Sequence, residues 1–183
     1  MIEMRFHGRG GQGAVTCAEL VAQAAISIGK FATAFPSFGP ERRGAPVVAF
    51  ARMDDKPIKM RSKIYNPDVV VVLDPSLLEI ANPAEGLHKD GILILNSSQD
   101  PESIRKQISF NGRLAITDAS KIAKEVLGLP ITNTTMVGAL VKAAGVVSVD
   151  ALLEPFNKRF GKIASRNIEA MKRAFEETAV FEK

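Results

Sequence analysis

Three glycines close together near the start of the chain constrain its fold most strongly. The stretch FHGRGGQGAV spaces Gly8, Gly10 and Gly13 in the pattern G-x-G-x-x-G. A β-type run, Ile2–His7, precedes this pattern, and a helical pattern, Gln12–Ile28, overlaps its end. At a strand-to-helix junction, glycines permit a tight turn and let an anion approach the N–H groups that open the helix. The pattern therefore predicts a site for a phosphate or pyrophosphate group.

The residues around this loop narrow the choice of ligand. A nucleoside triphosphatase loop needs Lys and Ser or Thr after its last glycine, but Ala14 and Val15 follow here. An NAD site needs a carboxylate at the end of the second strand. We expect this strand at Phe31–Phe35, and it ends in Ala-Phe-Pro without a carboxylate. The nearest charged cluster, Glu41-Arg42-Arg43, suits a phosphate better than a ribose diol. NADP and coenzyme A both carry a pyrophosphate and a third phosphate, and both stay open at this point.

The rest of the chain alternates strand and helix patterns. The segment FPSFGPERRGAP, residues 35–46, holds too many prolines and glycines for a helix or a central strand. Central strands are predicted from apolar, β-branched runs, and helices from apolar stripes of helical spacing. The predicted strands are a hairpin of Val47–Arg52 with Pro57–Arg61, then Asp68–Asp74, Gly91–Asn96 and Arg113–Asp118. The predicted helices are Pro75–Ala81, Pro101–Gln107, Ala119–Leu127, Thr134–Ala144, Val149–Phe160 and Ala164–Val180. This order predicts one α/β domain over residues 1–183, a three-layer α/β/α sandwich. Its sheet is expected to be mixed and mostly parallel, with one antiparallel hairpin and a helical C-terminal part.

Several functional classes are disfavoured by the composition. The single cysteine, Cys17, cannot ligate a cluster and is expected in the core, and two histidines, His7 and His88, are too few for a metal site. No catalytic set of residues can be assembled from the sequence. The net charge of +4 permits an anionic partner, but no aromatic-plus-basic pattern indicates nucleic acid. No apolar run is long enough for a membrane span, and no secretory leader is visible, so we expect a cytoplasmic protein.

Four stretches in order carry a resemblance to a known family. They are GRGGQGAVTCAELVAQAA at 8–25, FPSFGPERRGAPVVAFAR at 35–52, PDVVVVLDPSLL at 67–78 and NTTMVGAL at 133–140. Together they resemble the gamma subunit of the 2-oxoacid:ferredoxin oxidoreductases, most closely the pyruvate type, over essentially the whole chain. The resemblance implies a complex that oxidises pyruvate with coenzyme A and ferredoxin to acetyl-CoA, CO2 and reduced ferredoxin. It implies further that this subunit binds coenzyme A and closes the active site. Thiamine pyrophosphate, magnesium and iron–sulfur clusters would lie on partner alpha, beta and delta subunits.

The same resemblance supplies the candidate site residues, none of them catalytic and none of them a metal ligand. The phosphate cradle would be Gly8, Arg9, Gly10, Gly11, Gln12 and Gly13, and the ligand-facing loop would be Ser37, Gly39, Pro40, Glu41, Arg42, Arg43 and Gly44. We expect Arg9, Arg42 and Arg43 to contact phosphates and Glu41 to orient an arginine or a polar ligand group. Asn133 and Thr134 are expected to cap a helix rather than line the site. Two alternatives are an NADP-dependent reductase and a structural subunit that only bridges its partners.

Overall fold

The structure is a computed structural model that describes residues 1–37 and 44–183. Its elements follow one another in the order β1 (Ile2–Arg9), α1 (Ala14–Ser27), β2 (Phe31–Pro36), β3 (Pro46–Asp54), β4 (Val69–Val72), α2 (Leu77–Ile80), β5 (Ile92–Asn96), α3 (Pro101–Ile108), β6 (Arg113–Thr117), α4 (Ala119–Leu127), α5 (Asn133–Ala144), α6 (Val149–Phe160), a 3-10 turn η1 (Gly161–Ile163), α7 (Ala164–Glu177) and β7 (Ala179–Phe181).

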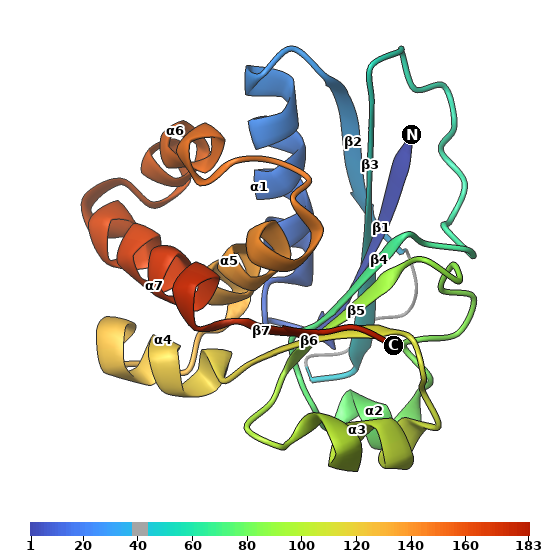
Figure 1. The fold of residues 1–183 in the computed structure, drawn as a ribbon. Helices are drawn as coiled ribbons and strands as arrows, with labels where there is room; N and C mark the ends of the chain where they lie inside the picture. The colour runs from blue at the N-terminus through green and yellow to red at the C-terminus, as the bar shows by residue number, and fades with distance from the viewer. Residues whose placement is uncertain (38–43) are drawn as a thin grey trace.

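The strands of the described residues form one mixed sheet in the order β2-β3-β1-β4-β5-β6-β7 (Figure 1). Strands β1, β4, β5 and β6 pair in parallel, and β3 pairs antiparallel with both β1 and β2. Strands β1, β2, β4, β5 and β6 therefore run one way, while β3 and β7 run the other. The predicted mixed, mostly parallel sheet is confirmed.

The antiparallel hairpin is formed by other strands than those predicted. Val47–Arg52 lies in β3 as expected, but Pro57–Arg61 forms no strand. Strand β3 already pairs with β1 along one edge and with β2 along the other, so it has no free edge for a third partner. The hairpin is instead β2–β3.

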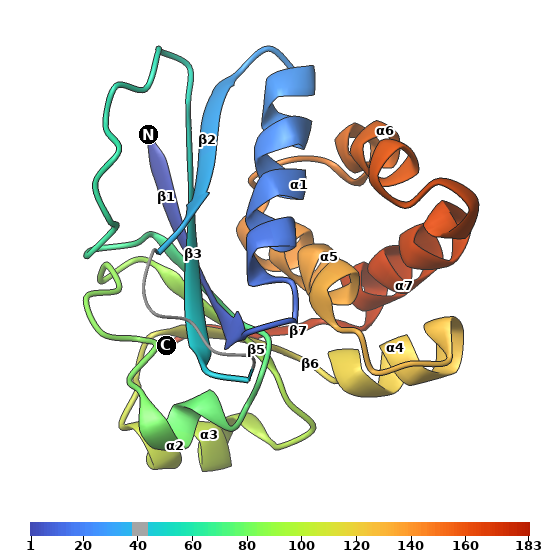
Figure 2. The ribbon, with the colours of Figure 1, turned by 180° about the vertical axis from the view of Figure 1, so that it is seen from behind.

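Helices cover the sheet as two layers, each with its own apolar core. On one face, α1 and α5 lie on the sheet and join Met4, Phe6, Ala49 and Ala51 in one apolar core, while α6 and α7 pack on the outer side of these two helices (Figures 1 and 2). On the other face, Leu77 of α2 and Ile104 of α3 pack on β4, β5 and β6. The predicted three-layer sandwich is confirmed. No helix in the described part of the chain is long and apolar enough to cross a membrane.

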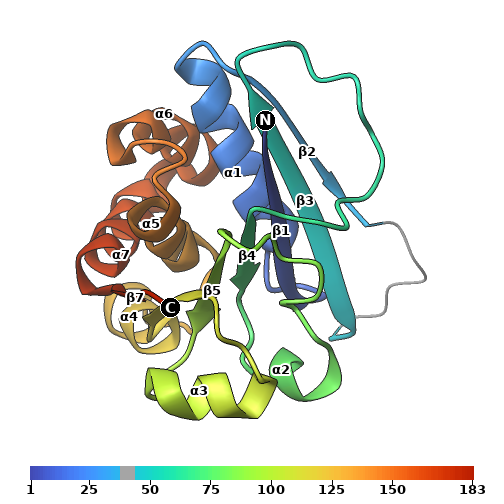
Figure 3. The same cartoon turned by 45° about the vertical axis from the view of Figure 1, so that its right-hand side comes forward.

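The second layer covers only half of its face. The connection between β3 and β4, rather than a helix, passes in front of β1 and β3 on the side away from α1 (Figure 3). Because side chains alternate along a strand, Glu3, Arg5, His7 and Arg9 all point to this side of β1. A central strand with this many polar side chains on one face needs partners there other than an apolar helix.

The C-terminal end differs from the predicted helix. Helix α7 ends at Glu177, Thr178 takes an extended conformation, and β7 then pairs antiparallel with β6. Thr178 is buried and its hydroxyl donates to the Ala174 carbonyl, which closes the last turn of the helix. Strand β7, which was not predicted, pairs with the outer edge of β6 and so satisfies backbone groups that an open edge would expose.

Candidate functional site

The glycine loop lies at the point where the sheet connections change direction. From β1 the chain crosses through α1 to β2, on one side of β1, while from β4 it continues through α2 to β5 on the other side. The adjacent carboxyl ends of β1 and β4 therefore form the switch point at which open α/β sheets bind ligands. The loop from Gly10 to Gly13 occupies this point.

The backbone of the loop requires glycine at two positions. Gly11 and Gly13 have φ angles of 93° and 84°, in the left-handed region that favours glycine. A Cβ on Gly13 would lie 2.4 Å from Nδ2 of Asn133, so the close approach that it permits is to α5. Gly8 lies within β1, where a Cβ would make only an ordinary contact of 3.4 Å with Ala14. Gly13 therefore serves the packing of the start of α1 against the start of α5.

The N–H groups of the loop divide into two sets. Gly10 N donates to the Ala45 carbonyl at 2.8 Å and Gln12 N to the Arg9 carbonyl at 2.9 Å, so neither N–H group is available to donate to an anion. Within the described residues no side chain caps α1, and no acceptor takes the N–H groups of Gly11 and Gly13. The first-turn N–H groups of a helix also have no intrahelical partner. The free donors at the start of α1, with the positive end of its dipole, suit an anion.

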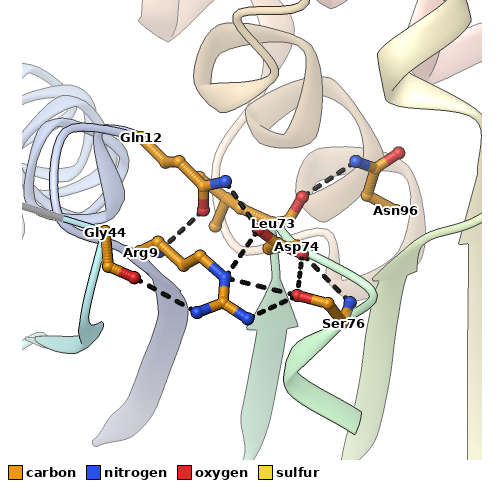
Figure 4. A network of polar contacts seen from close by, with 7 residues as sticks. All are labelled: Arg9, Gln12, Gly44, Leu73, Asp74, Ser76 and Asn96. Carbon is orange, nitrogen blue, oxygen red and sulfur yellow. Dashed lines mark hydrogen bonds and ion pairs between the residues drawn. The ribbon is translucent and has the colours of Figure 1, made fainter. Parts of the chain in front are cut away.

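Arg9 is held within the protein by a network of polar contacts (Figure 4). Its Nε lies 3.2 Å from Oδ2 of Asp74, its Nη2 donates to Oγ of Ser76 at 2.7 Å, and its Nη1 donates to the Gly44 carbonyl at 3.1 Å. Gln12 joins the same network, because its Nε2 donates to Oδ2 of Asp74 at 2.7 Å and its Oε1 accepts from Arg9 N at 2.6 Å. The guanidinium expected to contact phosphate thus clamps the glycine loop to the end of β4.

Asp74 is the centre of this network and was not among the predicted site residues. Burial alone would raise its pKa, but hydrogen bonds from Ser76 and Gln12 and the charge of Arg9 together lower it. The carboxylate therefore stays ionised and holds the loop in place at neutral pH. The signal in the sequence was its position directly after an apolar strand, where a parallel sheet places its functional side chains.

Two asparagines fix the neighbouring ends of the sheet and of α5. Asn96, at the end of β5, donates to the Leu73 carbonyl at 2.8 Å and to Oγ of Ser120 at 2.9 Å, which ties β4, β5 and α4 together (Figure 4). Asn133 begins α5 and accepts from the N–H of Thr134, whose own hydroxyl donates to Asn167. Neither is the N-cap, which is Thr132, so the predicted capping is wrong in position, although Asn133 does satisfy one N–H of the first turn.

The predicted ligand-facing loop is described only at its two ends. Ser37 donates its N–H to the Val48 carbonyl at 2.7 Å, and Gly44, with a φ of 83°, donates to the Gly10 carbonyl at 3.3 Å. Gly44 therefore lies beside the glycine loop, whereas Ser37 lies beside β3. The remaining predicted residues, Gly39, Pro40, Glu41, Arg42 and Arg43, lie outside the described residues.

Cys17 is a core residue, as expected. It is buried, burial raises the pKa of its thiol to about 12, and its Sγ lies 3.3 Å from the Asn133 carbonyl oxygen. In residues 1–37 and 44–183 no group of three His, Cys, Asp or Glu side chains could hold a metal ion. The side chains of the described residues therefore do not fit an iron–sulfur cluster or a thiamine-bound magnesium ion.

Comparison with known proteins identifies the family. The pyruvate ferredoxin/flavodoxin oxidoreductase family matches residues 3–177. The pyruvate/ketoisovalerate oxidoreductases common subunit gamma of Thermococcus litoralis is 50% identical over 184 residues and covers 100% of both chains. The crystal structure of pyruvate oxidoreductase subunit PORC from Thermotoga maritima is similar, with a TM-score of 0.89, 40% identity and coverage of 99% of this chain and 98% of that one.

A third relative places the same fold within a longer chain. The 2-oxoglutarate:ferredoxin oxidoreductase of Magnetococcus marinus, with 2-oxoglutarate, coenzyme A and succinyl-CoA bound, has a TM-score of 0.75 and 20% identity. The match covers 96% of this chain but 30% of that chain, and at this identity it shows the fold alone. The family and the full-length relatives agree with the resemblance in the sequence, and the chain belongs to the pyruvate ferredoxin/flavodoxin oxidoreductase family as a gamma-type subunit.

Proposed function

We propose that this chain is the gamma subunit of a pyruvate:ferredoxin oxidoreductase and that it binds the pyrophosphate of coenzyme A at the start of α1. The observation that carries this proposal is the set of N–H groups at Gly11, Gly13 and the first turn of α1 that have no acceptor within the described residues, located at the switch point of the sheet. The relatives named for pyruvate oxidoreductases support the reaction. The coenzyme A in the Magnetococcus complex supports the ligand.

Each group of the site has a separate part in this function. The N–H groups of the loop and of α1 would hold the pyrophosphate, and Arg9 acts as a positioning residue because Asp74 and Ser76 hold its guanidinium. Arg42 and Arg43, from the sequence, would neutralise the remaining phosphate charge. The thiol of the coenzyme would then accept the acyl group that forms on a partner subunit.

The remaining chemistry belongs to partner chains in this proposal. Thiamine pyrophosphate and magnesium oxidatively decarboxylate the 2-oxoacid, and iron–sulfur clusters pass its electrons to ferredoxin. The donor sets of the described residues do not fit these groups, so we assign them to the alpha, beta and delta subunits of a cytoplasmic complex. Residues 1–183 would act as one domain that closes over the active site.

Calorimetric titration of the chain with coenzyme A, NADPH and NAD tests the proposal. We expect binding of coenzyme A that is lost when Gly11 and Gly13 are both replaced by valine, because each valine at positive φ displaces the loop. Circular dichroism of the double variant checks that its fold is kept. Tighter binding of NADPH than of coenzyme A would support a reductase instead, and absence of binding to the chain and to the assembled complex would support a bridging subunit.

A further inference from the structure

A pocket of about 720 Å³ opens on the half of the sheet that no helix covers. Its floor includes His7 of β1 and Val48 and Phe50 of β3, and its walls include Ile64, Tyr65 and Leu77. The end of the pocket nearest the glycine loop includes Ser37 and Pro46, and Pro46 pairs with Arg9 in the strand register. One end of the pocket therefore lies beside the start of the glycine loop, on the side of β1 opposite α1.

Arg5 holds the walls of this pocket together. Its Nη2 donates to the Pro83 carbonyl at 2.8 Å and also to the Glu85 carbonyl, and its Nη1 donates to the Tyr65 carbonyl at 3.4 Å. Its Nε donates to Nε2 of His7 at 3.0 Å. One guanidinium thus fixes two connecting segments, and its N–H groups are directed at protein acceptors. The pocket is built in advance, and Arg5 does not make it an anion site.

His7 contributes a polar group to the pocket without a charge. Because its Nε2 accepts from Arg5, the proton of the neutral ring lies on Nδ1. Burial, and then the charge of Arg5, lower the pKa of His7 to about 3, so the ring is neutral at physiological pH. The polar side chains of Ser37, Asn66 and Asn82 add further donors and acceptors to a mostly apolar surface, and two side chains of opposite charge, Lys63 and Glu85, also line the pocket. These features suit a flat, neutral ring with hydrogen-bonding edges rather than a phosphate.

We infer that this pocket receives the adenine base of the coenzyme A molecule whose pyrophosphate binds at the start of α1, with the base stacked against Tyr65. This inference rests on the proposed function. The base, rather than the other end of the coenzyme, belongs here because the thiol must leave this chain to meet an acyl group on a partner subunit. Gly11 lies four positions after His7, a span of at most about 14 Å, which an adenosine and its pyrophosphate can bridge.

Tyr65 makes the inference directly measurable. It is 71% exposed, and it is the only tyrosine in a chain that has no tryptophan. The tyrosine fluorescence of the chain therefore reports on this one side chain, and a stacked base quenches it. An exposed aromatic ring at a pocket rim is also a common platform for a nucleotide base.

The experiment titrates the full chain with coenzyme A, adenosine 3′,5′-bisphosphate and 4′-phosphopantetheine, and follows tyrosine emission and heat together. We expect the two adenine-bearing ligands to quench the emission and phosphopantetheine to leave it unchanged. N-acetyltyrosinamide at the same ligand concentrations corrects for absorption by adenine. In Tyr65→Ala, the affinity for coenzyme A should fall about tenfold, while that for phosphopantetheine stays the same. Phe31→Ala, which removes a 45% exposed ring outside the pocket, is the matched control and should change neither.

The outcomes separate this inference from the proposed function. If coenzyme A releases heat but leaves the emission of Tyr65 unchanged, and Tyr65→Ala binds it as the natural chain does, the base lies elsewhere and the inference is wrong while the proposed function stands. If neither coenzyme A nor phosphopantetheine binds, the proposed function and the inference both fail.

Discussion

Acidification should destabilise this protein through one identifiable histidine. The pKa of His7 is about 3 in the folded chain, against about 6.5 for an unfolded histidine. Between these pH values the histidine is protonated in the unfolded state but neutral in the folded state, so the free energy of unfolding falls as the pH falls from 6.5 towards 3. The full difference would amount to about 3 kcal/mol at pH 4. Because His7 is only half-buried, solvent reduces this to about 2 kcal/mol.

Replacing His7 by glutamine isolates this contribution. The glutamine oxygen can still accept from Nε of Arg5, but the side chain does not titrate. Urea unfolding at pH 7 and pH 4 gives the free energy of unfolding of each protein. The natural chain should lose about 2 kcal/mol more than His7→Gln over this interval. The exposed His88 is the only other histidine, so His88→Gln is the matched control and should keep the full loss. Equal losses in His7→Gln and in the natural chain would refute the argument.

Three further substitutions test the site. Gly13→Ala should cost about 1–3 kcal/mol in urea unfolding, more than Gly128→Ala, because both have a positive φ but only Gly13 faces a neighbouring amide; equal costs would contradict the close contact. Asp74→Asn should cost about 1–2 kcal/mol and weaken coenzyme A binding in calorimetry, since it loosens the clamp on the loop; unchanged affinity would mean that the clamp does not order the site. Arg42→Ala with Arg43→Ala should raise the KM of the assembled complex for coenzyme A by about tenfold or more and spare decarboxylation without it; equal loss of both would mean that these residues hold the complex together.

The parts of the fold that were predictable from the sequence are those that local pattern determines. The runs in β4, β5 and β6 are mostly apolar because both of their faces are buried, and α4 and α6 have the predicted ends. Pairing between distant strands has no such local signature. The insertion of β3 between β1 and β2, and the short β7 after α7, depend on which sheet edges are free.

The same division holds for the candidate site. The glycine spacing predicted the loop and the helix after it, but of its three glycines, Gly8, Gly10 and Gly13, only Gly13 has a positive φ, and the second such position is Gly11. The partner of Arg9 was not predictable, because Asp74 lies 65 residues away and the two meet only when β1 and β4 pair. The pocket above β1 was missed for a related reason. Arg5 and His7 alternate with core residues and look like the solvent face of a strand until the β3–β4 connection is seen to cross them.

The proposed function requires that coenzyme A binds through its pyrophosphate to the main-chain N–H groups at the start of α1. Amide NMR spectra of the chain during a titration with coenzyme A test it most directly. We expect the largest shifts on the N–H signals of Gly11, Gly13, Ala14 and Val15, and a smaller shift on Gly10, whose N–H already donates to Ala45. Saturable binding with the largest shifts on another surface, and none at the start of α1, would contradict it.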